Sequence, residues 1–201
     1  MIILQELRKR YGGREVLSGI SVTFQTGLVH VITGVSGSGK TTLLQILAGY
    51  DNPTSGAIQM QKPLRLEYAP QDFLLFSNLT VWQHMQLKAA ARHLEGGWYE
   101  RAQRLLADLG MASYARSRIS MLSGGERRRI QLALALLAPC DVLLLDEPTS
   151  NLDAMASEHV WATLAREGVG KTMMICSHAP VPEQFRLVRW QLRGGLLDGE
   201  K

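Results

Sequence analysis

Cysteine is scarce in this sequence, which has Cys140 and Cys176 as its only two thiols in 201 residues. Both lie in apolar runs, which is typical of buried thiols in a reduced compartment and excludes a disulfide framework or a zinc site. Long apolar runs are missing too, because Gln131, Pro139 and Asp141 interrupt the longest candidate, residues 130–145. A membrane span needs about 20 predominantly apolar residues, so we expect no transmembrane helix.

Charge of one sign is not in large excess either. Lys and Arg number 22 and Asp and Glu 18, which leaves a net charge of +4. This excess is too small for a nucleic-acid-binding surface, and we expect no nucleic-acid partner. We therefore interpret Arg127, Arg128 and Arg129 as a solvated helix face with local ion pairs. The 46% of hydrophobic and 20% of charged residues are those of an ordinary globular protein.

Strand and helix patterns alternate along most of the chain, which predicts a doubly wound α/β core. A turn at Tyr11-Gly12-Gly13 separates the first two predicted strands, and residues 80–110 form a helical stretch broken at Gly96-Gly97. The predicted strands are 2–7, 18–24, 28–33, 57–60, 65–68, 142–145 and 172–177, with short strands around 194–195, and further helices are predicted at 41–48, 126–138 and 154–166.

Residues 34–41, GVSGSGKT, match the pattern GxxxxGK[ST] between a predicted strand and a predicted helix. The glycines allow backbone N–H groups to converge on phosphate oxygens, and the helix N-terminus adds partial positive charge. Lys40 can reach the β- and γ-phosphates, and the Thr41 hydroxyl can bind Mg²⁺. The alternative is a glycine turn before a helix with an incidental lysine.

Two carboxylates follow the apolar run 142–145. Ligands of parallel sheets bind beyond the carboxyl ends of the strands, so Asp146 is expected beside the phosphate loop, where it can hold Mg²⁺. Glu147, one residue further, can orient and polarise a water that attacks the γ-phosphate. The alternative is a strand end that is simply wetted by acidic residues.

The segment Leu122-Ser123-Gly124-Gly125-Glu126 precedes this acidic strand. It resembles the LSGGQ signature of ATP-binding cassette (ABC) ATPases, with Glu126 in place of the usual glutamine. In this family the signature of one copy contacts the nucleotide of another in a head-to-tail dimer. Read alone, the segment is an N-cap, because a Ser followed three residues later by Glu forms a capping box.

Other residues match the same family in the same order along the chain. Tyr11 resembles the aromatic residue that stacks on adenine. Gln71 resembles the glutamine that senses Mg²⁺ and links the core to the helical lobe. Asp153, in Ser150-Asn151-Leu152-Asp153, resembles the residue that joins the two active sites. His178, after an apolar strand, resembles the histidine that contacts the γ-phosphate and the attacking water.

The resemblance implies a fold and a division of the chain. The expected fold is the P-loop NTPase core of the ABC ATPases with an N-terminal antiparallel β subdomain and an inserted α-helical lobe. Residues 1–201 would form one ATPase domain, with the core and β subdomain in 1–70 and 139–201 and the helical lobe, signature helix included, in 71–138. A coupling helix of a membrane subunit would dock near Gln71 and residues 73–81.

The implied cofactors are ATP and Mg²⁺. The residues implied in catalysis are Glu147, His178, Lys40 and Gln71, and those implied in holding the metal are Thr41, Gln71 and Asp146. The residues implied in binding the nucleotide are Tyr11, Gly34, Ser36, Gly37, Ser38, Gly39, Lys40, Thr41, Thr42, Ser123, Gly124, Gly125 and Asp153.

By this resemblance the chain is expected to be the ATP-hydrolysing subunit of an ABC transporter. Its partners would be a second copy of itself and integral membrane permease subunits, at the cytoplasmic face of the cell membrane. The alternative is an ABC ATPase that drives transmembrane signalling or regulates the cell envelope without moving a solute. A nucleic-acid-associated ABC ATPase is a third class, which typically carries two cassettes or long insertions.

Overall fold

The computed structural model describes residues 1–72 and 74–199, and it divides into two compact units. The first unit comprises Met1–Gln71, Asp141–Glu147 and Gly170–Lys201, and the second comprises Asp72–Cys140 and Pro148–Val169. Each unit is described by itself. The division at 70 and 139 that the family resemblance implies stays a prediction. Among the described residues, no helix has both the length and the apolar character that crossing a bilayer requires.

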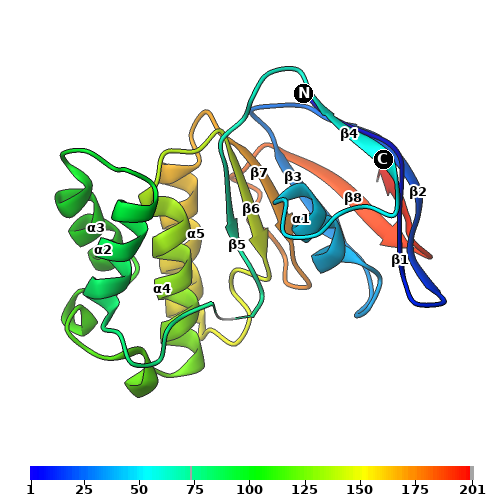
Figure 1. The fold of residues 1–201 in the computed structure, drawn as a ribbon. Coiled ribbons are helices and arrows are strands. Elements are labelled where there is room, and N and C mark those ends of the chain that lie inside the picture. Colours follow the sequence, from blue (N-terminus) through cyan, green and yellow to red (C-terminus); the bar gives the residue numbers. More distant parts are fainter. Residues whose placement is uncertain (73, 200–201) are drawn as a thin grey trace. The chain divides into compact units, whose positions relative to one another are not determined.

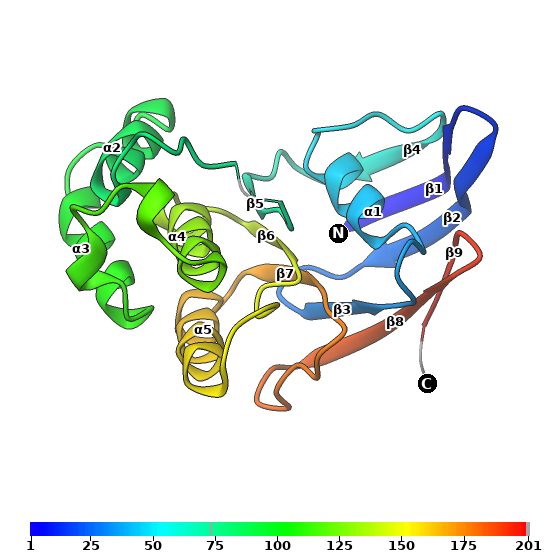
Figure 2. The same cartoon turned by 90° about the horizontal axis from the view of Figure 1, so that it is seen from below.

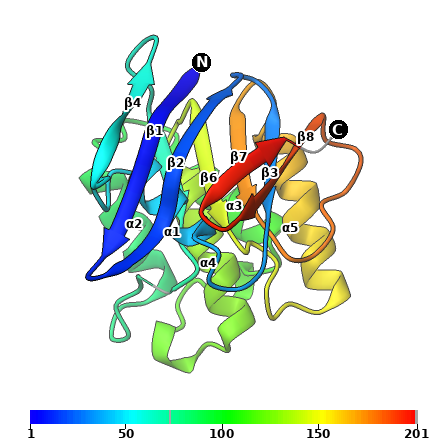
Figure 3. The same cartoon turned by 90° about the vertical axis from the view of Figure 1, so that its right-hand side faces the viewer.

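An antiparallel sheet in the order β2–β1–β4 begins the first unit (Figure 3). Its strands are β1 (Ile2–Tyr11), β2 (Arg14–Phe24) and β4 (Ser55–Met60). The turn is where the sequence predicts it, but β1 and β2 both extend to the turn, beyond the predicted ends at 7 and 18. Register shifts along β1, with Glu6 at a φ of 46°, explain the difference, because such irregularities interrupt the alternation of apolar and polar residues.

The second sheet of this unit has the strand order β5–β6–β7–β3–β8–β9. All neighbours are parallel except the last pair, β8 and β9. Every residue of β6 and β7 is buried, as expected for parallel strands covered on both faces. The elements are β3 (Val29–Thr33), β5 (Leu66–Ala69), β6 (Val142–Asp146), β7 (Thr172–Cys176), β8 (Leu187–Arg193), β9 (Leu196–Gly199) and the helix α1 (Lys40–Leu47).

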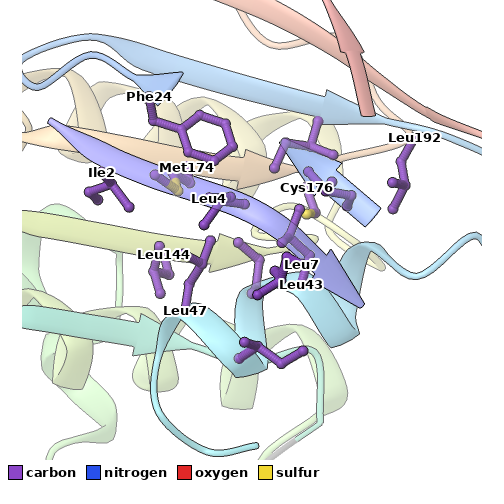
Figure 4. Close-up of a cluster of buried hydrophobic side chains, with 14 of the residues drawn as sticks. Ile2, Leu4, Leu7, Phe24, Leu43, Leu47, Leu144, Met174, Cys176 and Leu192 are labelled. Carbon is purple, nitrogen blue, oxygen red and sulfur yellow. The ribbon is translucent and has the colours of Figure 1, made fainter. Parts of the chain in front are cut away.

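The core of the first unit forms where α1 packs among the strands of both sheets. Leu43 and Leu47 of α1 lie close to Leu4 of β1 and Leu144 of β6, in one cluster of buried side chains (Figure 4). Burial of each leucine contributes roughly 2 kcal/mol relative to an exposed one. This packing fixes α1, and with it the glycine-rich loop that precedes the helix.

The second unit consists mainly of helices (Figures 1 and 2). The predicted helical stretch with a break at Gly96-Gly97 is present as α2 (Val81–Ala91) and α3 (Trp98–Asp108). Two longer helices, α4 (Gly124–Leu137) and α5 (Ala154–Glu167), lie side by side in both views, and short 3₁₀ turns cover Ala112–Tyr114 and Ile119–Met121.

The interpretation of the three arginines of α4 as a solvated face is wrong. Arg128 is only 5% exposed. The guanidinium of Arg129 donates to the carbonyl of Leu109 at 3.0 Å, and that of Arg127 donates to the carbonyl of Ser120 at 3.5 Å. The side chains of Arg127 and Arg129 thus connect the preceding segments to α4, and the sequence pattern could not reveal these contacts because they join separate elements.

Candidate functional site

The first unit contains a cavity of about 410 Å³ at the carboxyl ends of its parallel strands. Ligands of such sheets bind in this place, where the loops that follow neighbouring strands meet. The cavity brings together the loop after β3, the acidic end of β6 and His178, which lies two residues after the end of β7. It is lined by Tyr11, Arg14, Val16, Ser36, Gly37, Ser38, Gly39, Lys40, Thr41, Thr42, Gln71, Asp146, Glu147 and His178.

The glycine-rich loop needs two of its glycines for close packing. A Cβ on Gly34 would lie 2.5 Å from the carbonyl oxygen of Leu192, so no side chain fits there. Gly39 has a φ of 107° and is the N-cap of α1, and among the described residues no side chain hydrogen-bonds to this helix start. The first N–H groups of α1 are therefore available to an external anion.

Lys40, the first residue of α1, turns back over this loop. Its ammonium donates to the carbonyl oxygens of Gly34 at 2.8 Å and Val35 at 3.3 Å, and the residue is 6% exposed. The same ammonium lies 3.3 Å from Nε2 of His178. These contacts hold the buried Lys40 ammonium beside the N-terminus of α1.

Glu147 and His178 lie against each other at the ends of β6 and β7. Nε2 of His178 is 3.5 Å from Oε1 of Glu147, and the backbone N–H of His178 donates to Oε2 at 3.3 Å. Glu147 has a φ of 52°, and its own N–H donates to the carbonyl of Cys176 at 2.8 Å. This left-handed backbone conformation carries strain for a non-glycine residue. The carboxylate is thereby held 3.5 Å from an imidazole that also lies 3.3 Å from Lys40.

The residues predicted to hold the metal share the same cavity. Thr41 offers a hydroxyl, Gln71 an amide oxygen and Asp146, only 1% exposed, a carboxylate. Such oxygen donors fit Mg²⁺, which is a hard cation. Burial first, and then the Asp146 carboxylate, raise the pKa of the neighbouring Cys176 thiol well above its usual value.

Tyr11 is the last residue of β1 and lines the cavity with 47% of its surface exposed. Arg14 and Val16, at the start of β2, line the cavity as well and were missed by the sequence reasoning. A signal for both was present, because a hairpin at Gly12-Gly13 with longer strands places the residues after the turn near Tyr11. The interrupted alternation in β1 concealed that extension.

Ser123, Gly124, Gly125 and Asp153 lie in the second unit and do not line this cavity. Ser123 caps α4 in the predicted capping box, because its Oγ accepts from the N–H of Glu126 while the Glu126 carboxylate accepts from the N–H of Ser123 at 2.7 Å. Asp153 caps α5 by accepting from the N–H of Ala156 at 2.7 Å.

The signature segment and the segment before α5 touch within the second unit. A Cβ on Gly125 would lie 3.1 Å from Leu152 and 3.2 Å from the carbonyl of Asn151. The two helix starts that the sequence singled out are thus packed together. Residues 74–81 of the same unit, part of the expected docking segment, expose Leu74 by 64% and Phe76 by 61%. Phe73 lies outside the described residues.

Comparison with known proteins decides the family. A sequence model of the ABC transporter family matches residues 17–150, which is two thirds of the chain. The chain belongs to the ABC transporter family. It is an ABC-type ATPase that binds ATP. The match includes the phosphate loop, the LSGGE segment and the acidic end of β6.

Among its relatives is the zinc import ATP-binding protein ZnuC of Halorhodospira halophila, which is 32% identical over 180 residues that cover 89% of this cassette and 68% of that protein. The aliphatic sulfonates import ATP-binding protein SsuB of Pseudomonas putida is 36% identical, over 86% of this cassette and 65% of that protein. The phospholipid-transporting ATPase ABCA3 of Homo sapiens is 34% identical over 82% of this cassette, which spans only 10% of that protein.

Solved structures confirm the expected fold. The dimeric, post-hydrolysis form of the ATP-binding cassette MJ0796 bound to ADP and Pi matches with a TM-score of 0.89 and 25% identity, over 100% of this chain and 98% of that one. A further dimeric structure of the bacterial cassette MJ0796 gives a TM-score of 0.90 with 26% identity.

Proposed function

We propose that the chain hydrolyses ATP with Mg²⁺ to power solute movement through separate membrane subunits. The observation that carries this proposal is the cavity of the first unit, which gathers Lys40, Asp146, Glu147 and His178 beside an uncapped helix N-terminus. A lysine, two acidic groups and free N–H donors suit a triphosphate and its metal ion. The membership of the ABC transporter family supplies the link to transport.

In the proposed reaction the loop N–H groups and the Lys40 ammonium bind the β- and γ-phosphates and stabilise the negative charge that develops as the terminal phosphoryl group leaves. Glu147 accepts a proton from the attacking water, and the product is ADP with inorganic phosphate. His178, 3.5 Å from the Glu147 carboxylate, orients that water and contacts the γ-phosphate. Mg²⁺, held by Thr41, Gln71 and Asp146, would neutralise charge on the phosphates.

The second part of the proposal is a head-to-tail dimer of two copies. Ser123, Gly124 and Gly125 of one copy would contact the γ-phosphate bound by the other, and Asp153 would join the two sites. The two dimeric cassette structures among the similar proteins support this arrangement. Because an identical pair obeys two-fold symmetry, two such sites would form at once. Hydrolysis removes the bridging charge and favours separation of the two copies.

Membrane permease subunits are the proposed partners, at the cytoplasmic face of the membrane. The exposed Leu74 and Phe76 are the described residues near Gln71 that would meet them. The relatives named above import zinc or aliphatic sulfonates or transport phospholipids, and this variety assigns no cargo to the present chain.

The test is the variant Glu147→Gln, which keeps the size of the side chain and removes its basicity. We expect hydrolysis to fall by roughly 10²- to 10⁴-fold, because general-base catalysis contributes about that factor. ATP binding should persist, and gel filtration with ATP and Mg²⁺ should show a stable dimer. Hydrolysis at the rate of the unmodified chain would disprove the assignment of the base.

The same variant also identifies the partner. When it is purified from membranes in mild detergent with ATP and Mg²⁺, we expect an integral membrane protein to accompany it. A permease fold in that protein would support transport, and a sensor or a regulator of a cell-wall enzyme would support the signalling alternative. Recovery of ribosomes or nucleic acid without a membrane protein would contradict both.

A further inference from the structure

A partly buried ion pair outside the nucleotide-binding motifs lies next to Tyr11. Lys9 is only 8% exposed, and its ammonium donates to Oδ1 of Asp51 at 2.5 Å and to the carbonyl oxygen of Asn52 at 2.7 Å. Lys9 and Tyr11 are two residues apart on β1, and both side chains contact Asp51, so they lie on the same side of the strand. Asp51 follows the end of α1 and therefore comes from a separate part of the chain.

The same carboxylate also holds the phenol of Tyr11. The hydroxyl of Tyr11 donates to Oδ2 of Asp51, while the ammonium of Lys9 lies 4.7 Å from the centre of the Tyr11 ring. This hydrogen bond is the main cause that raises the pKa of Tyr11. Hydrogen bonds from Lys9 first and Tyr11 second lower the pKa of Asp51. Both shifts indicate a neutral phenol bonded to an ionised carboxylate.

The backbone fixes Asp51 from two directions. Its N–H donates to the carbonyl of Gln45 in α1 at 3.3 Å, and Oδ1 accepts from the N–H of Asn52 at 2.7 Å. Further along the turn, the N–H of Thr54 donates to the carbonyl of Arg8 at 2.8 Å, which ties the turn to β1. The carboxylate is thus placed by the helix that begins at the phosphate loop and by the strand that carries Tyr11.

Packing alone does not explain this arrangement. The ion pair is only partly buried, with 11% of the Lys9 side chain and 25% of the Asp51 side chain exposed, and an ion pair of this kind contributes little to stability by itself. What the pair adds is a fixed orientation of the Tyr11 side chain. A tyrosine with 47% of its surface exposed would otherwise sample several rotamers, and here its ring is held at the edge of the cavity with one face toward the Lys9 ammonium.

We propose that Asp51 is a positioning residue for the nucleotide base, which acts by holding Tyr11 in the orientation that stacks on that base. This inference rests on the proposed ATP-binding function of the cavity. The base stacks on the ring face opposite the Lys9 ammonium. Because the ring is ordered before the nucleotide binds, binding does not have to immobilise it, which favours affinity.

The first experiment compares ATP with inorganic triphosphate, which lacks the base, as ligands of the purified full chain. In Asp51→Asn we expect the dissociation constant for ATP to rise roughly 2- to 12-fold, the factor that corresponds to immobilising one side chain. Affinity for triphosphate should not change. In steady-state hydrolysis the KM for ATP should rise by the same factor while kcat stays the same, because Asp51 acts on binding of the base.

Two further variants separate positioning from a general structural effect. Asp141→Asn is the matched control, because Asp141, like Asp51, accepts from a basic side chain and a backbone N–H, here both of Arg65, and it lies outside the cavity. It should leave both dissociation constants unchanged. Tyr11→Phe keeps the ring and removes the bond to Asp51, so it should weaken ATP binding as Asp51→Asn does. The double variant should be no weaker than either single one.

The outcomes distinguish this inference from the function on which it rests. Tyr11→Ala should weaken ATP binding by roughly 5- to 150-fold, as loss of base stacking does. If Tyr11→Ala has that effect while Asp51→Asn and Tyr11→Phe have none, the positioning role is overturned and base stacking stands. Equal loss of ATP and triphosphate affinity in Asp51→Asn would also overturn it, in favour of a structural role. If the unmodified chain binds neither ligand, the proposed function itself fails.

Discussion

The helices α1 and α4 both begin at glycine-rich segments, but their N-termini are completed in different ways. In α1 the N-cap is Gly39, and within the described part of the chain no side chain accepts from the first turn. In α4 the capping box of Ser123 and Glu126 occupies one donor of the first turn and the N–H of the cap itself. The chain therefore satisfies α4 internally and leaves α1 to a ligand.

This difference indicates which of the two helix N-termini can bind an anion without a second copy of the chain. An uncapped N-terminus retains both its N–H donors and the positive end of the helix dipole. Glu126 places a carboxylate at the start of α4, where it partly cancels that positive end. We therefore expect a single copy of the chain to bind nucleotide phosphates at α1, and α4 to contribute only when a phosphate already bound by another copy is brought to it.

The largest effect should follow from Lys40→Met, which removes the ammonium at the start of α1. We expect the affinity for ATP to fall roughly 10- to 150-fold, because hydrogen bonds to charged groups contribute about 1.5–3 kcal/mol. Isothermal titration calorimetry of the purified chain, without membrane partners, measures the change in affinity. Lys62→Met, on an exposed lysine, is the control. Unchanged affinity in Lys40→Met would place the phosphate site elsewhere and remove the basis of the comparison.

A smaller effect, on stability, should follow from Ser123→Ala at the other helix. Loss of this cap should lower the free energy of unfolding by about 1 kcal/mol, which urea denaturation measures. The affinity of a single copy for ATP should remain the same, while the ATP-dependent dimer of Glu147→Gln should weaken when Ser123→Ala is added. A change in the single-copy affinity would show that the two helix starts do not act separately.

The smallest effect should follow from Glu126→Gln, which retains an acceptor for the Ser123 N–H and loses the charge. We expect a loss of about 0.3–1 kcal/mol at neutral pH, the range for a charge at a helix terminus. The hydrogen bond from the Ser123 backbone, above all, lowers the pKa of Glu126, with a further contribution from Tyr114.

The sign of the pH dependence follows from that lowered pKa. A carboxyl group whose pKa is lower in the folded chain stabilises it above the unfolded pKa, and this contribution is lost as the pH falls through the folded pKa. The ordinary pKa of a glutamate side chain, which applies to the unfolded chain, is about 4.5. Urea denaturation of the unmodified chain and of Glu126→Gln should therefore differ at pH 7 and converge below about pH 4. A difference that persists in acid would show that the charge is not the cause.

The parts of the site that the sequence predicted are those formed by short, continuous segments. The loop before Lys40 and the acidic end of β6 could be placed because each follows a strand and because parallel strands end at one edge of the sheet. The capping box at Ser123 and the cap at Asp153 are local as well, and the structure contains both. The catalytic roles of these residues stay predictions.

What the sequence could not predict depends on contacts between distant segments. In the sequence, Lys9 is one of several basic residues of β1 and nothing marks it out. Asp51 follows 42 positions later, and only the folded chain brings the two side chains into contact. Arg14 and Val16 enter the cavity because β1 and β2 pair as far as the hairpin turn. Arg128 is likewise buried in the folded chain although three consecutive arginines are typical of a helix surface, so the helix-surface interpretation was wrong.

The buried thiol of Cys176 can serve as a probe of local opening in the core of the first unit. Cys176 is fully buried at the end of β7, with its raised pKa, and its carbonyl accepts from Glu147. Alkylation requires a thiolate that the reagent can reach, so modification of this sulfur must wait until the cluster of buried side chains around it opens. With Cys140→Ser as background, the labelling rate would measure how fast that cluster opens, and bound nucleotide should slow the opening.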